Sequence, residues 1–176
     1  MVDPVPIIVI RAALALLFAV SALQKLRAPA AFTHAVREYR LLPARLALPF
    51  AAVLIVLELV LAIGAFMGSA TAVLGIVALL LLYSVAIAIN LWRGRVEIDC
   101  GCGGASQGRP LSLWLLGRNG GLAALGALAL LPVVPRTLGL LDAFAIGAAL
   151  IVAAALYAAS ENLAGMSPRL RALHRG

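Results

Sequence analysis

The sequence is poor in charged residues, which fill only 12% of its 176 positions, and poor in aromatic residues, at 6%. Apolar residues make up 64% of the chain, and the mean hydropathy is +1.10. An ordinary soluble domain carries about 25% charged residues. This lack of charge therefore excludes a typical soluble fold and predicts an integral membrane protein.

Acidic residues are also scarce, with 7 against 14 basic ones and a net charge of +7. In a soluble protein such an excess would suggest a nucleic-acid partner. Here the basic residues lie between apolar runs, where they set orientation in the bilayer. We therefore expect the lipid bilayer, and no nucleic acid, as a partner.

Five apolar runs are present, and each is close to the roughly 20 residues that a membrane-spanning helix needs. They cover residues 5–23, 46–66, 71–92, 113–131 and 138–159. Asp3 precedes the first run and Arg11 lies inside it, so the basic region of a secretory signal is missing and we interpret this run as a retained helix. The predicted fold is an all-α membrane protein, an antiparallel bundle of four core transmembrane helices plus a fifth. Residues 1–165 would form a single multi-pass membrane domain, and 166–176 a basic C-terminal tail.

The connections between the runs predict the arrangement of the bundle. Residues 67–70 and 132–136 are short enough for tight hairpins, whereas the longer connections 24–45 and 93–112 must share one membrane face. Between Pro29 and Arg40, apolar and polar residues alternate with a helical period, which predicts a short interfacial helix. The small-residue patterns at 64–68 and 117–121 predict close helix approaches.

The basic residues are distributed unequally between the two faces. Twelve belong to the face of the long connections and the C-terminal tail, and Arg136 alone belongs to the other. By the positive-inside rule, the face with twelve is cytoplasmic and the N-terminus lies outside. The location that we expect is the bacterial cytoplasmic (inner) membrane.

Cysteine is scarce, and the only two in the chain are Cys100 and Cys102. They lie in a polar loop between two apolar runs, and Gly101 between them gives the backbone freedom that a small disulfide ring needs. Such a ring carries strain, and strained disulfides exchange easily. This pattern favours a redox-active thiol pair over a structural disulfide.

Several charged residues are expected to tune these thiols. The cations predicted on the same face stabilise a thiolate, and Asp99 opposes them. The cations are Lys25, Arg93, Arg95 and Arg118. Two other interpretations compete with a redox role: the cysteines are small buried hydrophobic residues, or they bind a metal with His34 and His174. The spacing is not that of a zinc motif, so we expect no metal site.

Arg11 and Glu58 are ionisable residues inside apolar runs, where charge is costly and usually has a partner. They lie roughly 9 and 12 Å from the outer ends of their runs, which predicts an intramembrane pair. The pair would be either a structural lock or part of a polar cavity for a quinone or a proton path. Asn90 and Asn119 flank the cysteine loop, and we expect them to hydrogen-bond its irregular backbone. Acidic Asp142 and Glu161 are interpreted as solvated helix caps.

Several motifs together resemble the MauE family of methylamine utilisation membrane proteins, within the broader DoxX-like group. They are Lys25-Leu26, Tyr39-x-x-Leu42-Pro43, Glu58, Ile98-Asp99-Cys100-Gly101-Cys102 and Arg118-Asn119. The similarity covers residues 7–131, and the Cys-Gly-Cys stretch between helices is its most specific part.

The resemblance implies a role in maturing the disulfide-rich small subunit of a periplasmic dehydrogenase, together with a thioredoxin-like partner. Gly103 stands where the family often has a bulky residue, which puts the particular client protein in question more than the redox chemistry. A periplasmic client is simplest to reach from outside, whereas the charge distribution places the cysteines inside. Three resolutions stay open: a quinone or a partner protein completes the electron path, the loop is reached from the membrane, or the cysteines lie on the outer face.

Two functions follow from the sequence. The first is a thiol/disulfide oxidoreductase, or a subunit of one, that acts through Cys100 and Cys102 on a disulfide-containing client. The alternative is a non-enzymatic membrane scaffold or small-molecule carrier whose polar interior includes Arg11, Glu58 and Asn90.

Overall fold

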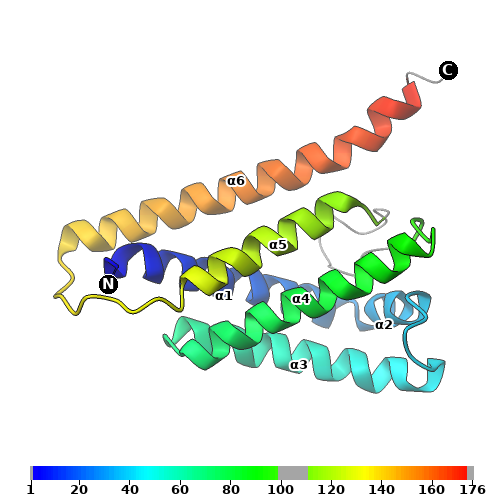
Figure 1. Cartoon of the computed structure of the whole chain (residues 1–176), viewed down its shortest axis with the longest axis horizontal. Coiled ribbons are helices and arrows are strands. Elements are labelled where there is room, and N and C mark those ends of the chain that lie inside the picture. Colours follow the sequence, from blue (N-terminus) through cyan, green and yellow to red (C-terminus); the bar gives the residue numbers. More distant parts are fainter. Residues whose placement is uncertain (1, 99–110, 174–176) are drawn as a thin grey trace.

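A computed structural model of the chain describes residues 2–98 and 111–173, the last ten of them (164–173) as backbone only. The described residues form helices and no strands, which confirms the predicted all-α membrane fold (Figure 1). The helices are α1 (Pro4–Arg27), α2 (Pro29–Glu38), the short 3-10 helix η1 (Ala44–Leu46), α3 (Ala47–Phe66), α4 (Ala70–Trp92), α5 (Leu113–Leu128) and α6 (Leu140–Leu173).

Four helices enclose the core, and a fifth long helix lies outside them. The closest packing is between α1 and α3 and between α4 and α5, and the hairpin of α3 and α4 joins the two pairs. Leu14, Phe18, Val73 and Ile76 are among the buried residues at the centre. Helix α6 runs along this bundle and extends beyond it at the C-terminal end (Figure 1). This is the predicted arrangement of four core helices plus a fifth.

Four segments are long and apolar enough to cross a membrane, and they are 4–27, 44–66, 70–92 and 140–163. The chain is therefore a multi-pass membrane protein. The fourth apolar run was expected to span as well, but α5 has only 16 residues. At about 1.5 Å per residue it is some 24 Å long, shorter than the ~30 Å hydrocarbon layer. Leu115 lies at the end of the bundle that carries α2, and Ala129 lies beside Arg11 toward the other end, so α5 with the turn that follows it still connects the two ends.

The ends of the first helices follow from their local sequence. Asp3 caps α1 by accepting a hydrogen bond from the backbone N–H of Val5, 2.9 Å away. Proline disfavours helical geometry in the residue before it, and Ala28, which precedes Pro29, has non-helical angles of φ −136° and ψ 61° and separates α1 from α2. Helix α2 is the predicted interfacial helix. The expected domain limit at residue 165 remains a prediction, although the α6 backbone continues past it to Leu173.

Close helix contacts were expected at two glycine patterns, 64–68 and 117–121, and the structure confirms only the first. A Cβ on Gly64 would lie 2.7 Å from the Cβ of Ala72, so α3 and α4 approach each other there. Gly68 has φ +84° and makes the turn of this hairpin. A Cβ on Gly117 or Gly121 would have no neighbouring atom within 4 Å, so that pattern reflects no close contact among the described residues.

Candidate functional site

The two cysteines lie in a segment whose ends are both anchored at one end of the bundle. Cys100 and Cys102, with Asp99 and Gly101, are outside the described residues. The described chain stops at Ile98 and resumes at Leu111, and both side chains are buried. The backbone N–H of Leu111 donates to the carbonyl of Val96 across 2.8 Å. The start and the end of the cysteine segment are therefore held together.

A small apolar cluster fixes these ends against the helices. Its buried members are Ile87 of α4, Ile98, Leu111 and Leu115 of α5, and we call it the anchor cluster. Tyr39, at the C-terminal end of α2, packs against it. The cysteine segment thus begins and ends beside α2, α4 and α5.

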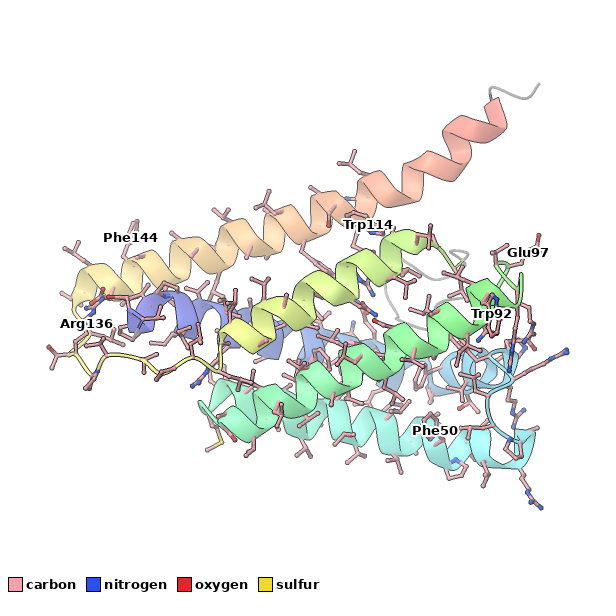
Figure 2. The ribbon with its side chains drawn as sticks, viewed as in Figure 1. Phe50, Trp92, Glu97, Trp114, Arg136 and Phe144 are labelled. Carbon is pink, nitrogen blue, oxygen red and sulfur yellow. The ribbon has the colours of Figure 1, made fainter. Side chains whose placement is uncertain are left out.

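The same end of the bundle carries both long connections, as the sequence predicts. Figure 1 shows α2 and the C-terminal end of α4 at the same side of the bundle, opposite the N-terminus. In Figure 2, Trp92 and Glu97 lie at this end and Arg136 at the other. Trp92 is 91% exposed, as expected of a tryptophan at the interface. The two faces that the charge pattern distinguishes are thus two real ends of the molecule.

A buried charged cluster lies inside the bundle, next to α2. We call Ser21 and Lys25 of α1, Glu58 of α3 and Tyr83 of α4 the Lys25 cluster. The ammonium of Lys25 forms an ion pair with Oε1 of Glu58, and both side chains are almost completely buried, at 3% and 1% exposure. The Tyr83 hydroxyl donates to the same Oε1 across 2.6 Å, and the Ser21 hydroxyl donates to Oε2 across 3.3 Å. One carboxylate therefore accepts from three side chains.

The ammonium of Lys25 is itself enclosed by acceptors and aromatic rings. It donates a second hydrogen bond to the Ser21 hydroxyl across 3.0 Å. It lies 4.9 Å from the ring centre of Phe32 and 5.2 Å from that of Tyr83, distances at which a cation is attracted to an aromatic face. The ammonium of Lys25 is thus paired with Glu58. Its predicted effect on a cysteine thiolate concerns residues outside the described part of the chain and stays a prediction.

The predicted pair of Arg11 with Glu58 is wrong. Arg11 donates through Nε and Nη2 to the carbonyl of Ala129, at 3.1 and 2.9 Å, and through Nη1 to that of Gly68, at 3.0 Å. Those carbonyls lie at the end of α5 and in the turn between α3 and α4. Helix α1 begins beyond this turn, so Arg11 lies level with the outer helix ends and not deep in the bundle. Its guanidinium satisfies helix-end carbonyls that otherwise lack donors.

The polar residues that flank the cysteine segment make side-chain bonds to residues close to them in sequence. Asn90 is fully buried and donates to the carbonyl of Ala86, and its oxygen accepts from Arg95 at 3.4 Å. Asn119 is also buried, and its oxygen accepts two hydrogen bonds from Arg118, at 3.3 and 3.2 Å. The sequence also predicts hydrogen bonds from Asn90 and Asn119 to the backbone of the cysteine loop. Most of that loop lies outside the described residues, so these bonds stay a prediction.

Glu161 is not the solvated helix cap that the sequence suggested. It accepts from Nη1 of Arg118 at 3.1 Å, and the two side chains are 14% and 11% exposed. This ion pair ties α6 to α5 near the cysteine end. Position along the apolar run placed Glu161 near a helix end, but the neighbouring helix α5 was needed to reveal its partner.

An ion-pair triad closes the opposite end of the molecule. Arg136 donates to Asp3 at 3.0 Å and to Asp142 at 2.8 Å. Asp142 also accepts from the backbone N–H of Gly139, so its predicted role as a helix cap is confirmed. The hydrogen bond from Arg136 lowers the pKa of Asp3, and the bonds to both carboxylates raise the pKa of Arg136. The triad joins the N-terminus to the start of α6.

Sequence reasoning missed the Lys25 cluster, although part of its signal was visible. Ser21 and Lys25 are four residues apart, so they share a face of one helix. Side chains on a helix lean toward its N-terminus, which directs Lys25 back into the bundle toward Glu58. Nothing in the sequence indicated that Tyr83 and Phe32 face the same point, because that depends on how the helices are rotated about their axes.

The chain matches known proteins over most of its length. The family model described as methylamine utilisation protein MauE matches residues 4–132. The methylamine utilization protein MauE of Methylorubrum extorquens is 44% identical over 144 residues, which cover 76% of this chain and 74% of the relative. That of Paracoccus denitrificans is 39% identical over 137 residues, covering 77% and 73%. A comparison with solved structures gives no significant match. With this family match and these identities, the chain belongs to the MauE family.

Proposed function

We propose that this protein catalyses thiol/disulfide exchange through Cys100 and Cys102 and so supports disulfide formation in a partner protein. The observation that carries the proposal is the placement of the pair. The only two cysteines of the chain, one residue apart, lie in a segment whose flanking residues Ile98 and Leu111 are buried in one apolar cluster, and the N–H of Leu111 donates to the carbonyl of Val96. Such an anchored segment suits two thiols that must meet repeatedly.

The proposed reaction conserves electrons and protons. A thiolate of the reduced client attacks the Cys100–Cys102 disulfide, and the mixed disulfide that forms is resolved by the client's second thiol. The client leaves with a disulfide, and the two cysteines hold the two electrons and two protons as thiols. They return to the disulfide by the same exchange with an oxidised thioredoxin-like partner, whose disulfide is reduced to a dithiol. A quinone is the alternative acceptor of these electrons and protons.

The relatives' names place them in methylamine utilisation. We extend that role to this chain, with a client protein of the methylamine system and a location in the bacterial inner membrane. The alternative function, a non-enzymatic carrier, required Arg11 and Glu58 to share one polar site. The two residues have separate partners, so they do not form a common site. Hydrogen bonds within the protein account for the donors of Arg11 and the oxygens of Glu58.

A redox titration of the full chain tests the proposal. The purified protein in lipid nanodiscs would be equilibrated with glutathione buffers of graded potential and its thiols counted by a maleimide mass shift. We expect both thiols to appear and disappear together, and the Cys100→Ser/Cys102→Ser variant to show no shift. In the oxidising buffers, where glutathione disulfide accepts the two electrons, a single Cys100→Ser or Cys102→Ser variant should form a mixed disulfide with a thioredoxin that lacks its resolving cysteine, and neither protein has a second thiol to release it. Thiols that stay reduced or oxidised at every potential would refute the function.

A further inference from the structure

The Lys25 cluster contains a buried ion pair, although apolar side chains would fill the same space without the free-energy cost of burying charge. Lys25 and Glu58 are 4% and 1% exposed, and every polar atom at the site is satisfied within the protein. Burying two charges costs several kcal/mol each, and an apolar replacement of such a pair is often neutral or stabilising. A buried ion pair is therefore better explained by the geometry that it fixes than by the stability that it adds.

The geometry that this cluster fixes includes α2. Ser21, Lys25, Glu58 and Tyr83 come from three core helices, but the ammonium also faces the ring of Phe32, which lies on α2. Phe32 is 9% exposed and packs in the main apolar core. A desolvated cation is attracted to an aromatic face more strongly than an exposed one. The cluster thus contributes a directional contact that holds the interfacial helix onto the bundle.

Helix α2 connects this contact to the cysteine segment. Tyr39 follows Phe32 by seven residues, which is close to two helical turns, so both side chains lie on the same face about 10 Å apart along the axis. Phe32 lies on the Lys25 cluster, and Tyr39 packs against the anchor cluster that contains Ile98 and Leu111. A displacement of α2 at Phe32 is therefore transmitted to both ends of the segment.

We infer that the Lys25 cluster is a latch that holds α2 against the bundle and, through Tyr39, positions the two ends of the segment carrying Cys100 and Cys102. Lys25, Glu58 and Phe32 are then positioning residues that never touch the sulfur atoms. The consequence for thiol chemistry rests on the proposed function, whereas the consequence for the segment ends does not.

Two variants test the latch in the full-length protein in nanodiscs. Phe32→Leu keeps an apolar side chain and removes the aromatic face, and Lys25→Met keeps the length of the side chain and removes the cation. The matched control is Phe50→Leu, because Phe50 lies on the outer surface of α3 with 36% exposure (Figure 2). Hydrogen exchange is measured at the α2 amides and at the Leu111 amide, which donates to Val96.

We expect both variants to raise exchange at α2 at least tenfold and at the Leu111 amide at least threefold, and in Phe32→Leu, which leaves the ion pair intact, the amides in the hairpin of α3 and α4 should stay unchanged. The equilibrium constant for thiol exchange with glutathione should move at least threefold in the same variants and stay constant in Phe50→Leu. Exchange that rises at α2 but not at Leu111 would overturn the inference, as would an unchanged α2. If Leu111 responds while the cysteines never cycle, the latch is supported and the proposed function fails.

Discussion

At the scale of residues, the carboxylate of Glu58 organises the interior. It accepts from Ser21 and Lys25 on α1 and from Tyr83 on α4, and it belongs to α3. Three of the four core helices are thereby fixed in rotation and in height relative to one another. Glu58 lies near the middle of its helix, where no water is available to replace a lost partner.

Removing one charge of this pair should cost far more than removing both. Lys25→Met leaves Glu58 buried with only two neutral donors, and breaking a buried pair in this way destabilises a protein by about 3–5 kcal/mol. The double variant Lys25→Met/Glu58→Leu removes the uncompensated charge, so we expect it to recover most of that loss. The measurement is the free energy of unfolding in detergent micelles.

Arg27→Met is the matched control, since Arg27 is an exposed cation on the same helix. It should unfold like the original protein. A double variant as unstable as Lys25→Met alone would contradict the coupling of the two charges, and so would a single variant with unchanged stability.

The sequence predicted that Glu58 has a buried partner but assigned the wrong one. Counting residues from the ends of the apolar runs gives depth only if the runs end at the same level. Helix α1 starts beyond the turn at Gly68, so Arg11 lies higher than the count indicated and bonds to that turn. Lys25 was assigned to the loop, yet its long side chain turns back into the bundle. The wrong partner was predicted for Glu58 because the depth of Arg11 was misjudged by a few ångströms and because the direction of the flexible Lys25 side chain was not foreseen.

At the scale of elements, glycine allows α3 and α4 to pack closely at one end of their hairpin. A Cβ added to Gly64 would lie 2.7 Å from that of Ala72, which is closer than the Cβ atoms of real side chains approach other atoms. Gly121 of α5 lies in a pattern with the same spacing, but a Cβ added there would have nothing within 4 Å. The two glycines are therefore a matched pair with opposite expectations.

Gly64→Ala should destabilise the protein by about 1–3 kcal/mol, because the added methyl group forces the hairpin apart. Gly121→Ala meets open space and favours the helix, so its effect should be neutral or stabilising by up to about 1 kcal/mol. Thermal unfolding of both variants in the same detergent checks the difference. Equal destabilisation of the two would show that the close approach at Gly64 does not limit packing.

The sequence predicted the elements more reliably than their contacts. Apolar run length located all five long helices, and helical periodicity located α2. The helix in the run at 113–131 is shorter than the run, because it ends at Leu128 and the next carbonyl, that of Ala129, accepts from Arg11. The contact with Arg11 joins residues that are 118 positions apart, which local patterns cannot reveal. The cysteine pair was recognised from sequence, and its anchoring by Ile98 and Leu111 required the fold.

At the scale of the whole molecule, the two ends of the bundle differ in charge and in chemistry. One end holds the cysteine segment, α2 and the large majority of the basic residues, and the other holds the triad of Asp3, Arg136 and Asp142. In that triad two carboxylates neutralise the single arginine. The positive-inside rule counts basic residues and is little affected by acidic ones, so it places the cysteine end in the cytoplasm.

Labelling with a membrane-impermeant maleimide tests this orientation in intact cells. Thr137→Cys, placed in a Cys100→Ser/Cys102→Ser background, puts one thiol in the exposed connection beside Arg136. We expect this thiol to be labelled in intact cells. The native cysteine pair, reduced beforehand with a permeant reductant, should be labelled only after the cells are permeabilised.

The opposite pattern would move the cysteines to the outer face and change the mechanism. A periplasmic client would then reach Cys100 and Cys102 directly, and the twelve basic residues at that end would violate the charge rule. If instead the predicted pattern holds, the single cysteine pair cannot carry electrons across the bilayer by successive internal disulfides, because the chain has no second pair. A thioredoxin-like partner or a quinone must then complete the path, so the labelling result decides which partner has to be sought.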